Sequence, residues 1–311
     1  DIYYLLASLA QLPLELIKLH NVLLGRDGFG AIRNQWINNE NVRFVNSLKV
    51  FDLKLSGFAE YSPNLLIHYL TAFPHLEVLS FDTLWTFEQI SISSLPTTIK
   101  RFELGNFKEI LVNDSDRSIY NLEFLSKFQL THLKVNGEFE FFPFELFSLG
   151  ELEHLDMLNV GFLYESDELI EQYYCKKMKY LAIRSPGILL FLPAMFSHFP
   201  VVERLIVSWI YSDDFDPYLK GILSAKSLKS LELEYFDQNT NYLGFDEQIS
   251  SSIEVLKLKG INWKYATSLF DMVNFLYLKE IHLSLEDDEF DLNEILGRLS
   301  HFFHLSSITL S

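Results

Sequence analysis

Basic and aromatic residues recur through the middle of this sequence at steps of 31, 22, 26 and 24 residues: Arg101, His132, His154, Tyr180 and Arg204. Arginine and aromatic side chains are frequent anchors of protein interfaces, and arginine binds carboxylates and phosphates through paired hydrogen bonds. If the fold brings these residues together, we expect them to bind an acidic or phosphorylated segment of a partner. The alternative is that Glu103, Asp156 and Glu232 neutralise the basic residues by local pairing.

Catalytic and metal chemistry are less well supported by the same residues. His132 and His154 lie one such step apart, and Asp156 or Glu103 could supply a third metal ligand. The spacing follows from the repeated interval and carries no ligand signature, so we expect neither a metal ion nor a cofactor. No serine or cysteine nucleophile is placed beside a His–Asp pair, which indicates a non-enzymatic protein. We expect Cys175, the one cysteine, to be a packed structural thiol.

The elements that must position these residues follow a short template, apolar-x-x-apolar-x-apolar, which recurs twelve times. The matches begin at Leu14, Leu48, Leu76, Ile99, Leu130, Leu152, Met178, Val202, Leu228, Ile253, Leu278 and Leu305. After a first step of 34 residues, the steps range from 22 to 31. Such self-similarity is typical of an array of repeated structural units.

Each template predicts a short β-strand, in which alternate side chains face opposite ways. The fourth and sixth positions, such as Leu155 and Met157, are predicted to face a core. The third and fifth, such as His154 and Asp156, are predicted to face outward, next to the same positions one repeat away. We therefore predict one partner-binding stripe: Arg101, His132, His154, Tyr180 and Arg204, with Arg184 and Trp209 close to it.

The segments between templates return the chain to the next strand. Residues 64–73, 165–174, 265–275 and 291–302 have the helical period, and acidic residues in a first turn suit the helix dipole. Residues 139–147 and 245–252 are expected to be short or irregular. The 28 phenylalanines can fill a core between returns of unequal length.

The template resembles that of the leucine-rich-repeat superfamily over about residues 14–311. This resemblance implies an α/β solenoid of about twelve irregular repeats, curved like a horseshoe. Parallel strands would line its concave face, and helices would cover its convex face. No linker or break in composition interrupts the repeats, so we predict one solenoid over residues 48–311, preceded by an N-terminal segment over residues 1–47.

The N-terminal segment has two interpretations. In the first, Leu14–Leu19 is the first strand and residues 1–11 form a helix. In the second, the run LPLELI from Leu12 is similar to the opening of an F-box, and Trp36 lies near the family's conserved position for tryptophan. His20 and an interruption at residues 27–30 depart from that pattern. The F-box resemblance implies that a Skp-type adaptor binds at the following residues: Leu12, Pro13, Leu16 and Ile17.

Charge and cysteine content limit the partners and the compartment. The sequence has 25 Lys and Arg against 42 Asp and Glu, a net charge of −17, which argues against binding to nucleic acid or an anionic membrane. The longest apolar run, Gly187 to Phe196, is far shorter than the roughly 20 residues that span a bilayer. A single cysteine favours a reducing compartment, so we expect the cytoplasm, the nucleus or both.

The repeats also suggest a class of function. Irregular repeats rich in Leu and Phe, with turns such as SLPTTI from Ser94, resemble the F-box/leucine-rich-repeat proteins of yeasts. That resemblance implies a substrate-recognition subunit of a cullin-RING ubiquitin ligase, which holds its target on the concave face. The alternatives are a scaffold subunit of a larger assembly and a repeat protein that resembles a GTPase activator.

Overall fold

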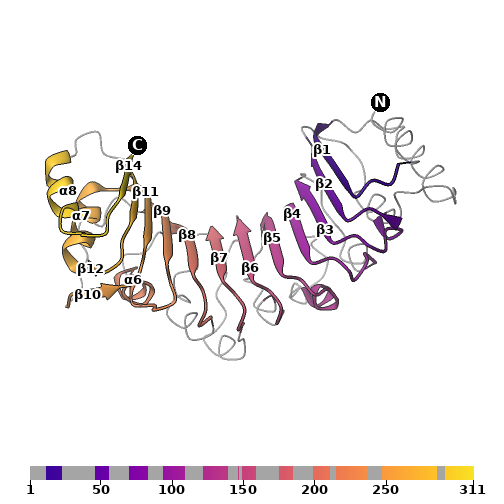
Figure 1. Cartoon of the computed structure of the whole chain (residues 1–311), viewed down its shortest axis with the longest axis horizontal. Coiled ribbons are helices and arrows are strands. Elements are labelled where there is room, and N and C mark those ends of the chain that lie inside the picture. The colour runs from indigo at the N-terminus through magenta and orange to yellow at the C-terminus, as the bar shows by residue number, and fades with distance from the viewer. Residues whose placement is uncertain are drawn as a thin grey trace, which may run out of the picture. The chain divides into compact units, whose positions relative to one another are not determined.

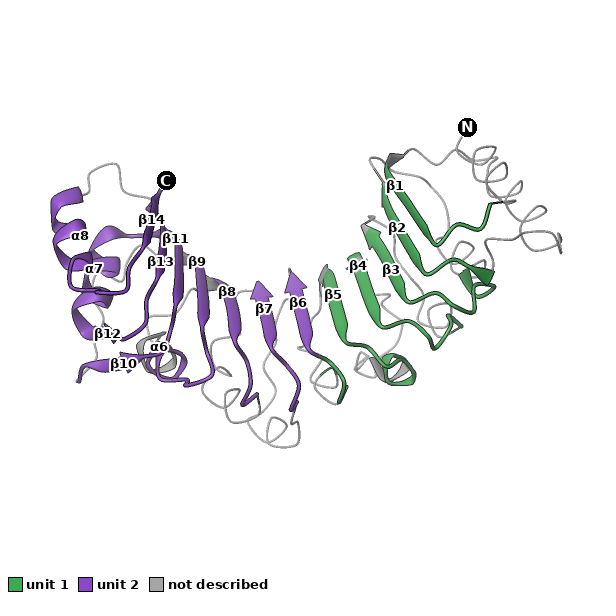
Figure 2. Ribbon diagram, viewed as in Figure 1, with its two compact units in different colours: residues 1–152 green, residues 153–311 purple. Residues whose placement is uncertain are grey.

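The computed structural model describes residues 12–22, 46–55, 70–82, 94–108, 122–138, 146, 149–158, 175–184, 199–210, 215–236, 247–285 and 291–311. The chain divides into two compact units, residues 1–152 and residues 153–311 (Figure 2). The boundary falls inside the stretch that the sequence predicts as one solenoid, where no change in composition marks it.

In unit 1, parallel strands pair in the order in which they follow one another along the chain (Figure 1). They are β1 (Leu16–Val22), β2 (Val50–Leu55), β3 (Val78–Asp82), β4 (Arg101–Lys108) and β5 (His132–Glu138). A 3₁₀ helix, η2 (Leu122–Lys127), precedes β5.

In unit 2 the parallel strands follow the order β6-β7-β8-β9-β11-β13-β14. These strands are β6 (His154–Leu158), β7 (Tyr180–Arg184), β8 (Arg204–Ile210), β9 (Ser230–Phe236), β11 (Val255–Ile261), β13 (Glu280–Leu285) and β14 (Ser307–Leu310). The short strands β10 (Ile249–Ser251) and β12 (Val273–Phe275) form a second sheet. The helices seen among the described residues of this unit are α6 (Phe215–Leu223), α7 (Trp263–Met272) and α8 (Leu292–Leu299). The predicted α/β class, with parallel strands, is therefore confirmed.

The strands pair in the register that the template predicts. In unit 1 the third template positions Leu16, Val50 and Val78 are Cα partners across β1, β2 and β3. In unit 2 the same holds from His154 in β6 to Ser307 in β14. First, fourth and sixth positions form the core, and most of the side chains that the structure describes there are almost fully buried. Strand alternation therefore sorts the side chains onto two faces as expected.

Two of the predicted helices are seen, with changed ends. Helix α7 starts after Asn262, whose side chain accepts a hydrogen bond from the amide of Lys264, an N-cap. It ends at Met272, and residues 273–275 form β12 instead of continuing the helix. Val273 and Phe275 are buried and pair with β10, whereas Asn274 between them is exposed. This two-residue alternation overrides the helical period at that point.

Helix α8 begins after Asp291, whose carboxylate accepts from the amides of Asn293 and Glu294. Helix α6 was not predicted. Most of the other predicted returns, at residues 64–73, 139–147 and 165–174, lie outside the described residues. Within the described part of the chain, no helix is long and apolar enough to cross a membrane.

Apart from Thr131 and Ser306, the second template position carries alternating acidic and basic residues, which we call the Glu–Lys ladder. Each of its ion pairs joins a lysine to the glutamate one strand earlier: Lys49–Glu15 (3.2 Å), Lys100–Glu77 (3.6 Å), Lys179–Glu153 (2.9 Å), Lys229–Glu203 (3.2 Å) and Lys279–Glu254 (2.6 Å). Opposite charges on neighbouring strands stabilise one register, although exposed pairs contribute only about 0.2–1 kcal/mol each. The ladder was missed because the repeats were compared at their outward strand positions.

The last strand departs from the burial pattern. Ile308 and Leu310 of β14 are 41% and 38% exposed, whereas the matching Ile281 and Leu283 of β13 are buried. Beside them lies a groove of about 440 Å³ with the following lining: Leu296, Leu299, Ser300, Phe302, Leu305, Ser306, Ser307 and Ile308. Phe303 nearby is 96% exposed.

Candidate partner-binding face

The outward residues of β6, β7, β8, β9 and β11 in unit 2 form a polar surface, which we call the charged face. Near its β6 side, His154, Tyr180 and Arg204 occupy the same register position on three neighbouring strands. The rings of His154 and Tyr180 stack with centroids 3.8 Å apart and planes 3° from parallel. The guanidinium of Arg204 lies 5.2 Å from the Tyr180 centroid on a cation–π contact. Because paired strands are roughly 4.8 Å apart, equal register positions place such groups at stacking distance.

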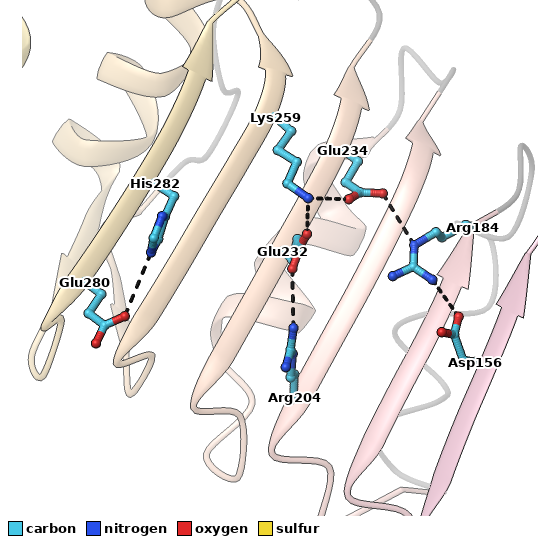
Figure 3. A network of polar contacts seen from close by, with 8 residues as sticks. All are labelled: Asp156, Arg184, Arg204, Glu232, Glu234, Lys259, Glu280 and His282. Atoms are coloured by element: carbon cyan, nitrogen blue, oxygen red, sulfur yellow. Dashed lines mark hydrogen bonds and ion pairs between the residues drawn. The ribbon is translucent and has the colours of Figure 1, made fainter. Parts of the chain in front are cut away.

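Arg184 is held between two acidic residues. Its Nη1 lies 2.6 Å from Oδ1 of Asp156, and its Nε lies 3.5 Å from Oε2 of Glu234 (Figure 3). Burial opposes the charge of Arg184, but the two carboxylates and a hydrogen bond with Tyr180 raise its pKa. Burial and the charge of Asp156 raise the pKa of Tyr180, and they outweigh the charges of Arg184 and Arg204, which lower it. The phenol therefore stays protonated at neutral pH.

Lys259 joins two further acidic residues. Its Nζ contacts Oε1 of Glu232 and lies 2.8 Å from Oε1 of Glu234 (Figure 3). On the other side of Glu232, Oε2 lies 3.6 Å from Nη2 of Arg204. Burial alone would raise the pKa of Glu232, but the hydrogen bond from Lys259 and the charges of Lys259 and Lys257 hold the pKa below its ordinary value. Glu232 is therefore ionised at neutral pH, although it is buried.

Three small or apolar residues of the same face are buried. Ala182 and Ile206 are register partners at the fifth template position, which is predicted to face outward, yet both are almost fully buried. Ser208 pairs in register with Arg184 on one side and Glu234 on the other, and it is also fully buried. Its hydroxyl oxygen has no hydrogen-bond partner among the described residues.

In unit 1, Arg101 and His132 occupy paired positions in β4 and β5. Arg101 does not present a free guanidinium, because its Nε lies 2.7 Å from Oε1 of Glu103 and its Nη2 contacts the same oxygen. Glu103 also accepts a hydrogen bond from Ser80 at 3.2 Å. The Nδ1 atom of His132 lies 2.9 Å from the hydroxyl of Thr131.

The predicted stripe is thus found in part. His154, Tyr180, Arg184 and Arg204 gather on the charged face of unit 2, and Arg101 and His132 lie together in unit 1. Trp209 belongs to β8, but its side chain lies outside the described residues. The alternative of local pairing is confirmed for the arginines.

Sequence reasoning missed three charged residues of this face, namely Glu234, Lys257 and Lys259. Lys257 stands at the fifth template position, from which the predicted stripe takes no residue. Glu234 and Lys259 stand two residues further along their strands and pair in register with each other. Arg184 occupies the same position in β7, so comparing that position on every strand would have found both.

The N-terminal residues form a strand. Leu16 and Ile17 begin β1, which pairs with β2, so the sheet extends across the predicted boundary at residue 47. Ile17 is buried, whereas Leu12 and Leu16 are 47% and 50% exposed. The strand of the first interpretation is therefore seen. The helix expected over residues 1–11 and Trp36 of the F-box interpretation lie outside the described residues.

The described part of the chain contains no group of three or more His, Cys, Asp or Glu residues arranged to hold a metal ion. Cys175 is fully buried, as expected for a packed thiol, and burial raises its pKa despite hydrogen bonds from the Lys177 and Met178 backbone. Compared with known protein-family models and with curated proteins, the sequence matches none.

Proposed function

We propose that this chain is a leucine-rich-repeat solenoid of about twelve repeats that binds a protein partner on its concave, strand-lined face. The observation that carries the proposal is the strand register, which aligns equivalent outward residues from repeat to repeat within each unit. Stacked repeats of this kind offer extended binding surfaces on a rigid support.

The residues of the charged face support the proposal. Tyr180 is fixed between His154 and Arg204, and Arg204 keeps 45% of its side chain exposed. Ordered aromatic and arginine side chains lose little conformational freedom when a partner binds, so they make good anchors.

The more specific role that we propose is recognition of the substrate of a cullin-RING ubiquitin ligase in the cytoplasm or nucleus. In this role a Skp-type adaptor would bind the N-terminal region, where Leu12 and Leu16 are half-exposed. The resemblance of the repeats to F-box/leucine-rich-repeat proteins supports this role.

The strand β1 favours a second candidate, a scaffold subunit held in a larger assembly. Residues that would open an F-box pair instead with β2. In that role the chain would bind a fixed set of proteins and would not bind ubiquitin-ligase components.

Affinity purification of the full-length protein from its native cells, followed by mass spectrometry, tests both roles. Recovery of a Skp-type adaptor and a cullin would support the ligase role. Recovery of a different set of proteins at constant stoichiometry would support the scaffold role. Recovery of no protein in stoichiometric amount would contradict a protein-binding function altogether.

Two pairs of variants locate the contacts. Tyr180→Ala should reduce partner recovery about tenfold if the charged face binds the partner, whereas Tyr277→Ala, outside that face and 54% exposed, should not. Leu12→Asp should abolish recovery of an adaptor, whereas Leu292→Asp, with similar exposure, should not. Equal effects within a pair would exclude the surface tested by that pair.

A further inference from the structure

The charged face of unit 2 gathers its basic groups around one buried carboxylate. Arg204 in β8 and Lys259 in β11 both contact Glu232 in β9. Lys257 is the register partner of Glu232 and acts on it through its positive charge. Three cations from two flanking strands thus surround one acidic residue.

The charges of this cluster lie at two depths. The side chains of Glu232 and Glu234 are 7% and 11% exposed, whereas those of Arg204 and Lys259 are each 45% exposed. In Figure 3 the lysine nitrogen lies between the two carboxylates. The acidic residues are therefore largely covered, and the surface offered to a partner is basic. Buried ion pairs also hold the basic groups in place before a partner arrives.

The balance of charge on these strands is positive. The outward positions of β6 to β9 and β11 carry the following charged residues: Arg184, Arg204, Lys257 and Lys259 against Asp156, Glu232 and Glu234, or 4 − 3 = +1. The whole chain has a net charge of −17. On the next strand, Glu280 and His282 lie 3.9 Å apart and bound the cluster on that side. A basic surface in so acidic a chain is a local feature that steers an anionic partner to one place.

We propose that this cluster binds an extended acidic segment of the partner protein, with Arg204, Lys257 and Lys259 providing the contacts to its carboxylates. This inference rests on the proposed protein-binding function and specifies the chemistry of the partner. Arg204 can donate to a carboxylate from the edge that does not face Glu232, and each lysine has three donors. Glu232 stays ionised beneath the cations, and its contacts with Arg204 and Lys259 keep them oriented.

Fluorescence anisotropy with a labelled peptide tests the site directly. The probe is an extended peptide with alternating Glu and Ser residues, and its control replaces every Glu by Gln. The acidic peptide should bind the wild-type chain, and binding should weaken as salt is added. Equal binding of the Gln peptide would contradict the proposal.

Matched variants separate this site from general charge effects. Arg204→Gln combined with Lys257→Gln should weaken binding at least about tenfold, equivalent to about 1.4 kcal/mol. Lys229→Gln combined with Lys279→Gln removes the same charge from the Glu–Lys ladder and should change binding less than about twofold. Equal loss in both double variants would overturn the site. Lys259 stays unchanged, because it holds both buried glutamates.

A third variant should act in the opposite direction. Glu232→Gln raises the local charge from +1 to +2 and keeps a side-chain oxygen that can still accept hydrogen bonds from Arg204 and Lys259, so it should tighten binding of the acidic peptide severalfold. Weaker binding by this variant, with an unchanged circular dichroism spectrum, would contradict the proposal. Tighter binding of a phosphoserine peptide than of the Glu peptide would support the site and identify a phosphorylated segment as its preferred ligand.

Failure of the acidic-segment site can be distinguished from failure of the proposed protein-binding function. If the chain captures a stoichiometric partner from cells but binds no anionic peptide, this site is excluded and protein binding stands. If the peptide binds at the cluster but no partner is captured, the site stands and the proposed cellular role is excluded.

Discussion

Lys179 lies one strand beyond Glu153 at the second template position, and its Nζ is 2.9 Å from Oε2 of Glu153. The backbone follows the same relationship, because the amide of Lys179 donates to the carbonyl of Glu153 at 2.9 Å. One ion pair and one backbone hydrogen bond thus join the same two residues, which precede β7 and β6. The repetition of this step makes the Glu–Lys ladder.

Reversing one charge of the ladder should weaken the fold slightly. A Lys229→Glu variant places a second carboxylate beside Glu203. It also removes the attraction between the Lys229 charge and Glu254. We expect the free energy of unfolding in denaturant to fall by about 0.5–1 kcal/mol at low salt. The loss should shrink in 1 M salt, where charges are screened within about 3 Å.

A control for that experiment lies close by. Lys226 is exposed and stands outside the ladder, so Lys226→Glu makes the same change in net charge. An equal loss of stability in this control would mean that total charge, rather than the ladder, is responsible.

The buried hydroxyl of Ser208 should be dispensable for folding. It has no hydrogen-bond partner among the described residues, and burial of an unsatisfied polar group costs about 1–3 kcal/mol. We expect Ser208→Ala to leave the free energy of unfolding unchanged or to raise it by about 1 kcal/mol. Chemical denaturation followed by tryptophan fluorescence measures the difference.

Ser80→Ala is the comparison, since Ser80 is also buried but donates to Glu103. This variant should lose about 1–2 kcal/mol. A destabilised Ser208→Ala variant would show that Ser208 contributes in a way that its unpaired hydroxyl does not reveal.

Acid should weaken the fold partly through Glu232. Its folded-state pKa lies below the ordinary value of 4.5, so its contribution to stability is present above that pH. The contribution is lost as the pH falls through the folded-state pKa. We therefore expect unfolding free energy to decline more gently below about pH 4.5 in Glu232→Gln than in the wild type.

A second variant should also reduce this loss, by a smaller amount. Lys257→Gln removes a cation that lowers the pKa of Glu232, so the folded-state pKa moves closer to the unfolded-state value and the acid-induced decline should be smaller and end at a higher pH than in the wild type. Superimposable pH profiles for all three proteins would contradict this account of Glu232.

Cys175 should react with thiol reagents after unfolding and resist them in the folded chain. It is fully buried, and burial raises its pKa, which lowers the fraction of reactive thiolate. We expect labelling at pH 8 to follow the unfolding transition in urea, with Cys175→Ser as the blank. Fast labelling of the folded chain would show that the thiol is accessible.

The sequence predicts the strands and their register well, because the template is a local pattern. Apolar residues such as Leu155 and Met157 alternate with polar residues, and this alternation is sufficient to place them in the core. The segment at Val273–Phe275 was harder to predict, since its helical and strand periods overlap. This segment forms a strand because it pairs with β10, which lies more than twenty residues earlier in the sequence.

What the sequence by itself determined is which residues share a face, since repeat spacing fixes the order of strands and strand geometry fixes the direction of side chains. Only the tertiary structure decided how the charges on that face are arranged. Arg204, Glu232 and Lys259 come from three strands, and their contacts depend on side-chain positions over a few ångströms. Burial of the carboxylates and exposure of the cations is likewise a property of packing, because neighbouring side chains, rather than residue type, determine which charge remains in contact with water.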